Sequence, residues 1–137
     1  MLTFMAITAL VAFGLARATT ANAEVSPGTI DGATTVDAAR AKALFDKGAI
    51  FVDVRKDSDW DAGRIPGSHH IELKSTYSEA ALGEAADKNA EVVLYCNGEK
   101  CLRPSKATVQ AVAWGFTKVS YFRDGMPAWE AAGFPVE

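Results

Sequence analysis

Residues 91–114 read EVVLYCNGEKCLRPSKATVQAVAW, and this stretch decides the fold. The run 91–95 consists mostly of apolar β-formers, which is typical of a strand covered on both faces. The segment 103–114 is typical of a helix, because Pro104 is tolerated in a first turn and Gly115 follows as a stop. A buried strand that leads into a helix is the repeating unit of a parallel α/β sheet.

The rest of the chain shows the same alternation of helical and apolar extended segments. This alternation predicts an α/β fold, with a small, mostly parallel sheet and helices on both of its faces. Residues 56–68 are expected to be a long irregular connection in which 58–62 makes one helical turn. The remaining predicted helices span 37–47, 78–87 and 126–132, and the remaining strands span 49–54, 70–73 and 119–122.

The composition allows one ordinary globular domain, which we place at residues 34–137. The chain has 137 residues, of which 49% are hydrophobic and 23% are charged, and this leaves no room for a second core. Its 14 basic and 17 acidic residues give a net charge of -3. Such a charge disfavours binding to nucleic acid or to an anionic membrane. An anionic ligand would need a confined site with local donors.

The amino-terminal residues 1–23 have the pattern of a signal peptide. Leu2 to Leu15 is an apolar stretch of the length of a signal-peptide core, and Ala21 and Ala23 supply the small residues of a cleavage site. We therefore predict cleavage after Ala23 and a periplasmic protein. No Lys or Arg precedes the apolar stretch, so an uncleaved anchor that holds the protein at the membrane, facing the periplasm, is the alternative. Residues 24–33 are rich in Gly, Ser and Pro and are expected to form a flexible leader.

Cys96 follows the predicted strand 91–95 directly, and this position favours a functional role. In open parallel sheets, ligands bind at the carboxyl ends of the strands, where the next helix begins with free amides. The loop 97–103 can wrap around the Cys96 sulfur with several backbone N–H groups facing it. Gly98 supplies the permissive backbone that such a nest needs.

The charges of this loop favour a reactive thiolate. Lys100, Arg103 and the helix end all stabilise negative charge on Cys96, whereas Glu99 opposes it and must point away. A thiolate ringed by amides can attack the outer sulfur of an anion such as thiosulfate and hold it as a persulfide. An acceptor nucleophile then removes that sulfur. This chemistry needs neither a metal nor another cofactor.

Three ordered motifs give the chain its resemblance to a known family. They are Val52-Asp53-Val54-Arg55 followed by residues 63–69 (GRIPGSH), then Tyr95-Cys96, and finally residues 124–129 (DGMPAW). With these motifs, residues 34–137 resemble a single-domain rhodanese. A subset of exported rhodanese-like proteins has a similar loop with a second cysteine.

The resemblance implies a sulfurtransferase that moves sulfane sulfur from thiosulfate, or a similar small anion, to a cyanide or thiol acceptor through a Cys96 persulfide. Rhodaneses usually have a six-residue loop, and here the helix is expected to start later, which leaves the substrate size open. The implied substrate cradle consists of Asn97, Gly98, Glu99, Lys100, Cys101, Leu102 and Arg103.

Cys101 leaves two other functions open. In an oxidising compartment it could be a resolving thiol or a disulfide partner, or it could be a passive loop thiol. The protein could therefore be a persulfide- or anion-binding module without turnover, or a thiol–disulfide redox module that uses Cys96 and Cys101. A metal site formed by these cysteines with His69 and His70 is disfavoured, because the spacing matches no common zinc pattern.

Other conspicuous side chains are expected to be structural. Asp53 and Arg55 are expected to tie the central strand to the loop after it. Tryptophans at helix positions usually fill the core. This expectation applies to Trp60, Trp114 and Trp129.

Overall fold

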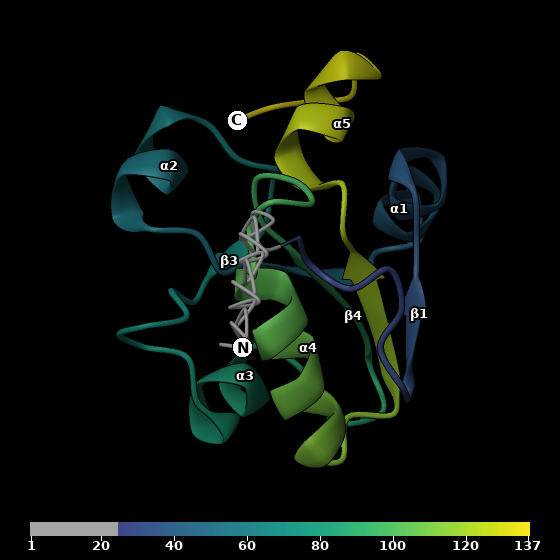
Figure 1. The fold of residues 1–137 in the computed structure, drawn as a ribbon, viewed down its shortest axis with the longest axis vertical. Helices are drawn as coiled ribbons and strands as arrows, with labels where there is room; N and C mark the ends of the chain where they lie inside the picture. Colours follow the sequence, from purple (N-terminus) through teal and green to yellow (C-terminus); the bar gives the residue numbers. More distant parts are fainter. Residues whose placement is uncertain (1–24) are drawn as a thin grey trace, which may run out of the picture.

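The computed structural model describes residues 25–137, so the predicted signal peptide lies outside the described residues. It contains a five-stranded sheet in which all neighbours run parallel, with the order β1-β5-β4-β2-β3 (Figure 1). The predicted α/β class with a parallel sheet is confirmed. The strands are β1 (Ala33–Thr35), β2 (Ile50–Asp53), β3 (His69–His70), β4 (Glu91–Tyr95) and β5 (Lys118–Phe122).

Helices connect the strands, and local capping explains where two of them begin. Asp37 accepts a hydrogen bond from the amide of Arg40 at 2.8 Å and so caps α1, and Ser78 caps α3 in the same way. Pro104 lies in the first turn of α4, where its missing N–H costs nothing. The helices are α1 (Ala38–Asp46), α2 (Asp57–Ala62), α3 (Glu79–Ala85), α4 (Arg103–Ala113) and α5 (Gly125–Ala131).

Two hydrophobic clusters fill the space on either side of the sheet. Successive side chains of a strand point to opposite faces, so Val92 and Leu94 pack with α3 and α4, while Val93 and Tyr95 pack with α1 and α5. In Figure 1, α3 and α4 lie side by side in the lower half and α5 lies near the carboxyl terminus. The helices therefore cover both faces, as predicted.

Two edge strands differ from the expectation. β1 was not predicted, because it is a three-residue segment of small and polar residues that pairs with β5 through its backbone. β3 was predicted at 70–73 but occupies His69–His70. Beyond β3, the amide of Ile71 donates to the carbonyl of Asp53 at 3.0 Å. The amide of Leu73 donates to the carbonyl of Val54 at 3.3 Å.

The three tryptophans do not share one environment. Trp129 is fully buried against Phe45 and Phe51, as expected of a core residue. Trp60 is only half-buried and stacks on His70, with ring centroids 4.8 Å apart. Trp114 is also half-buried but packs against the cluster that contains Val92 and Leu94, so the expectation that the tryptophans fill the core is wrong for Trp60 alone.

Because every strand runs in the same direction, the carboxyl ends of the strands meet at one edge of the sheet. Asp53, His70, Tyr95 and Phe122 occupy these ends. The loops that follow them are therefore the natural place for a functional site. Among residues 25–137, no helix has the length and apolar character needed to cross a membrane.

Candidate active site

Cys96 begins the loop that joins β4 to α4. Its carbonyl accepts a hydrogen bond from the amide of Met126 at 2.8 Å, so the start of α5 fixes the start of the loop. Only 2% of Cys96 is exposed. The residue thus lies at the carboxyl edge of the sheet, as predicted, beneath the surface of the molecule.

The contact between the start of α5 and the Cys96 loop requires a glycine at position 125, within the sequence DGMP. The φ of Gly125 is +61°, which is the left-handed region. A Cβ at this position would lie 2.2 Å from the carbonyl oxygen of Cys96 and 3.0 Å from the amide nitrogen of Gly98. A side chain is therefore excluded, and the close approach of α5 to the Cys96 loop depends on glycine.

The loop is closed by a disulfide between Cys96 and Cys101, whose Cα atoms are 6.4 Å apart. The amide of Cys101 donates to the carbonyl of Gly98 at 3.0 Å, which turns the chain back toward Cys96. Gly98 has a φ of +108° and so supplies the backbone conformation expected of it. The structure therefore describes the oxidised loop, in which neither sulfur is a free nucleophile.

Most of the loop amides have no backbone partner. Within residues 25–137, the amides of 97–100, 102 and 103 donate to no backbone carbonyl. Of these, the amides of 102 and 103 lie at the amino end of an eleven-residue helix, where unpaired donors favour an anion.

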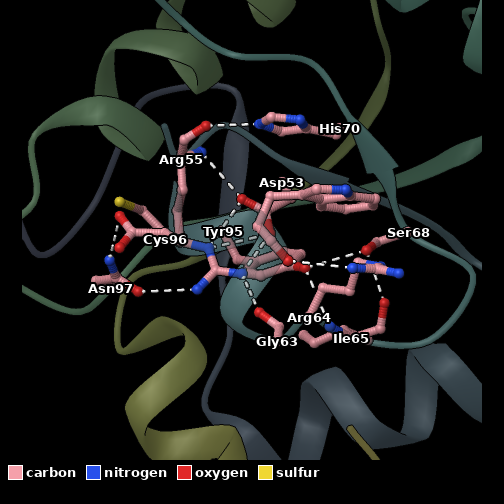
Figure 2. Close-up of polar contacts among 12 residues, drawn as sticks. Asp53, Arg55, Gly63, Arg64, Ile65, Ser68, His70, Tyr95, Cys96 and Asn97 are labelled. Atoms are coloured by element: carbon pink, nitrogen blue, oxygen red, sulfur yellow. Dashed lines mark hydrogen bonds and ion pairs between the residues drawn. The ribbon is translucent and has the colours of Figure 1, made fainter. Parts of the chain in front are cut away.

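A buried ion pair supports the loop from below. The guanidinium of Arg55 donates to the Asp53 carboxylate at 2.7 Å, and both side chains are nearly fully buried (Figure 2). The same group donates to the carbonyl of Gly63 at 2.6 Å and to the side-chain oxygen of Asn97 at 3.2 Å. Burial opposes the charge of Arg55, but the hydrogen bond and charge of Asp53 outweigh it and raise the arginine pKa. The expected structural role of the pair is confirmed, and Arg55 also links β2 to the loop.

The charged loop residues have different surroundings. The carboxylate of Glu99 lies 3.4 Å from Arg123 and pairs with it. Lys100 is exposed and, within the described chain, forms no ion pair. Arg103 pairs with Glu72 and donates to the carbonyl of Val54 at 3.1 Å, so its charge is already partly neutralised.

Glu72 is held as a carboxylate. Hydrogen bonds from Ser75 at 2.6 Å and from Arg103 lower its pKa from 4.5 to about 2. The site therefore uses Arg103 to fasten the start of α4 to the segment after β3. This role of Glu72 was not predicted, because the residue lies 31 positions before its partner.

Comparison with known protein families identifies the family of this chain. A family model described as "Rhodanese-like domain" matches residues 37–132, which include Cys96, its loop and the DGMP segment. The chain belongs to the rhodanese-like domain family. Its resemblance to rhodaneses, stated from the motifs alone, is confirmed.

This chain matches different shares of its relatives' own length. The thiosulfate sulfurtransferase GlpE of Pseudomonas fluorescens is 31% identical over 71% of this chain and 84% of its own length. An HTH-type transcriptional regulator of Mycobacterium tuberculosis is 35% identical over 63% of this chain, which spans only 36% of the regulator. Among solved structures, the Alr3790 protein of Anabaena is 26% identical, with a TM-score of 0.65 over 74% of this chain and 90% of its own.

A surface pocket of about 460 Å³ lies beside the rhodanese loop. The structure thus brings four of the predicted cradle residues to one hollow. The other predicted site residues lie outside its lining, namely Cys96, Cys101, Leu102 and Arg103. The lining residues are Asn97, Gly98, Glu99, Lys100, Asp124, Pro127 and Ala128.

Sequence reasoning missed a contact between the loop and the leader, residues 24–33. The amide and hydroxyl of Ser26 both donate to the Glu99 carbonyl, at 2.8 and 2.7 Å, and only 3% of Ser26 is exposed. Arg123 donates to the carbonyl of Ser26 at 2.9 Å. A segment expected to be a flexible leader therefore contacts the loop, and no local pattern predicts a contact across 73 residues.

Proposed function

We propose that this rhodanese is a sulfurtransferase whose reduced Cys96 takes sulfane sulfur from thiosulfate, or a similar small anion, and passes it to cyanide or a thiol. Membership of the family and the relation to GlpE support sulfurtransferase activity. The observation that carries the proposal is the position of Cys96 at the carboxyl end of β4, at the start of a loop with unpaired amides.

The reaction consists of two successive transfers of one sulfur atom. The Cys96 thiolate attacks the outer sulfur of thiosulfate, the S–S bond of the donor breaks, and sulfite leaves with the bonding electrons. The persulfide on Cys96 is then attacked at its outer sulfur by cyanide or a thiolate, which regenerates the thiolate. Amides at the start of α4 stabilise the anionic donor, transition state and persulfide, so the cycle needs no metal and no general base.

The oxidised loop must be reduced before this cycle starts, because a sulfur in a disulfide is not a thiolate and cannot attack the donor. A sulfurtransferase assay without a reductant is therefore expected to give a lag or no turnover.

Intact-mass analysis tests the proposal. Reduced protein exposed to thiosulfate should release sulfite and, in the Cys101→Ser variant, gain about 32 Da, the mass of one sulfur atom. Cys101→Ser is the matched control, since it keeps Cys96 as its single cysteine within the loop. Cys96→Ser should show neither sulfite release nor sulfur transfer to cyanide, and activity retained in this variant would exclude the proposal.

A thiol–disulfide redox module is the second candidate, and the Cys96–Cys101 disulfide favours it. In that case the Cys101 variant should lose function as completely as the Cys96 variant. A third candidate is a module that carries persulfide or binds an anion without turnover. It would acquire the sulfur adduct and then react poorly with every small acceptor.

We also propose that the protein is exported to the periplasm, with membrane anchorage of an uncleaved amino terminus as the alternative. An intramolecular disulfide is expected to persist in an oxidising compartment. Amino-terminal sequencing of the exported protein tests this: a new terminus at Glu24 supports cleavage, and a retained Met1 in a cytoplasmic fraction contradicts export.

A further inference from the structure

The two cysteines of the loop lie within bonding reach of each other. Cys96 and Cys101 are joined across only four intervening residues, and the Cys101–Gly98 hydrogen bond supports the turn that closes the ring. Cys101 is half-buried and packs against the same hydrophobic cluster as Cys96. The backbone of the loop thus places the Cys101 sulfur next to the sulfur of the proposed nucleophile, Cys96.

We propose that Cys101 is the internal acceptor for the Cys96 persulfide, so that the protein reduces the sulfane sulfur of its donor to sulfide. This inference rests on the proposed function, because it needs the persulfide. It assigns Cys101 a catalytic role and makes the described disulfide a product of the reaction.

The chemistry balances with the donor anion and the two thiols alone. After Cys96 has taken sulfur from thiosulfate, the Cys101 thiolate attacks the inner sulfur of the persulfide. The Cys96–Cys101 bond forms, the bond to the outer sulfur breaks, and hydrosulfide leaves with the electron pair. In sum, two thiols and thiosulfate give one disulfide, sulfite, hydrosulfide and one proton. The two cysteines are oxidised by two electrons, and the sulfane sulfur is reduced by two.

The site of attack follows from the bond in the structure. The Cys101 sulfur is bonded to the Cys96 sulfur itself, which is the inner atom of the persulfide. Attack at this atom expels the outer sulfur, whereas an external acceptor in the proposed transferase cycle attacks the outer one. An internal thiol held near its target also has a large advantage in effective concentration over a thiol in solution.

Each cycle leaves the loop oxidised, so a further round requires a dithiol reductant. Exposure indicates which sulfur that reductant reaches, because Cys101 is half-buried and Cys96 is only 2% exposed. Attack on the Cys101 sulfur releases Cys96 as the leaving thiolate. The reductant thereby restores the nucleophile at the carboxyl end of β4.

A single-turnover experiment tests the inference. The full-length protein is reduced, freed of reductant, and mixed under anaerobic conditions with one equivalent of thiosulfate and no other thiol. The wild type should release one sulfite and one sulfide per chain and lose about 2 Da on forming the disulfide. Cys101→Ser should form the persulfide and gain about 32 Da but release no sulfide, whatever the rate at which it releases sulfite.

The outcomes separate the two proposals. Sulfite release by Cys101→Ser shows that this variant is folded and active in the first step. If the wild type keeps the 32 Da adduct (about one sulfur atom) without releasing sulfide, or if Cys101→Ser releases as much sulfide as the wild type, the internal acceptor is excluded while the transferase survives. If neither protein releases sulfite, the proposed function fails, and this inference fails with it.

Discussion

Arg55 neutralises a carboxylate that has no contact with water. Asp53 is fully buried, and Arg55 donates to it through two nitrogens at 3.0 and 2.7 Å. Removing one partner of such a pair leaves an uncompensated buried charge. We expect Arg55→Met to lower the free energy of unfolding by about 3–5 kcal/mol, measured by urea denaturation.

An exposed ion pair provides the control for that prediction. Asp46 pairs with Lys42 at 2.6 Å, but the Asp46 side chain is 58% exposed. Asp46→Asn should cost less than about 1 kcal/mol, because solvent screens surface pairs. If Arg55→Met cost no more than Asp46→Asn, the buried pair would not be a main support of β2 and the loop.

Gly125 is the residue at which the backbone of α5 meets the Cys96 loop. Gly125→Ala should cost about 2–5 kcal/mol, from the left-handed backbone and from the clash with the Cys96 carbonyl. Gly133→Ala is the matched control, because Gly133 has a similar φ of +74° but a Cβ placed there would meet nothing within 4 Å. The control should lose only about 1–2 kcal/mol in the same urea titration. Equal losses in the two variants would contradict a specific contact at Gly125.

The segment before β1 holds the active-site loop in place through hydrogen bonds from Ser26. Ser26→Ala removes the hydroxyl bond to the Glu99 carbonyl, and one such bond contributes about 1 kcal/mol. The amide of Cys101, which donates to the carbonyl of Gly98 within the loop, should then exchange with deuterium roughly five-fold faster.

A second hydroxyl near the same segment serves as the control for Ser26. Thr35 donates to the carbonyl of Gly28 at 2.8 Å and makes no hydrogen bond to the loop. Thr35→Ala should leave exchange at the Cys101 amide unchanged. If both variants accelerated it equally, the effect would reflect general loosening of β1, and Ser26 would have no specific role.

The elements that sequence reasoning found are those with a strong local pattern. β2 and β4 are short apolar runs buried on both faces, and α4 has a proline in its first turn and a glycine after its end. β1 has no such pattern, because its three residues are held by backbone pairing with β5. Its existence depends on a partner more than 80 residues away, which no local window contains.

Prediction of the candidate site from local sequence is limited in the same way, because its residues come from distant parts of the molecule. Cys96 could be placed from the sequence, since it directly follows β4 and the strand ends of a parallel sheet share one edge. The residues that hold its loop come from distant segments: Ser26 before the sheet, Arg55 after β2, and Gly125 at the start of α5. The motifs that contain Arg55 and Gly125 predicted the family, but only the folded chain shows which contacts these two residues and Ser26 make.

The pair of Glu72 and Arg103 couples the stability of the whole domain to pH. The pKa of Glu72 falls from 4.5 to about 2 on folding, so its carboxylate stabilises the native state above pH 4.5. That stabilisation should be lost as the pH falls from 4.5 to about 2, because the unfolded chain binds the proton first. Urea midpoints of the wild type and of Glu72→Gln should therefore differ most near neutral pH and converge across this window. The exposed Glu84, changed to Gln, should show no such convergence, and a constant gap for Glu72→Gln would exclude the coupling.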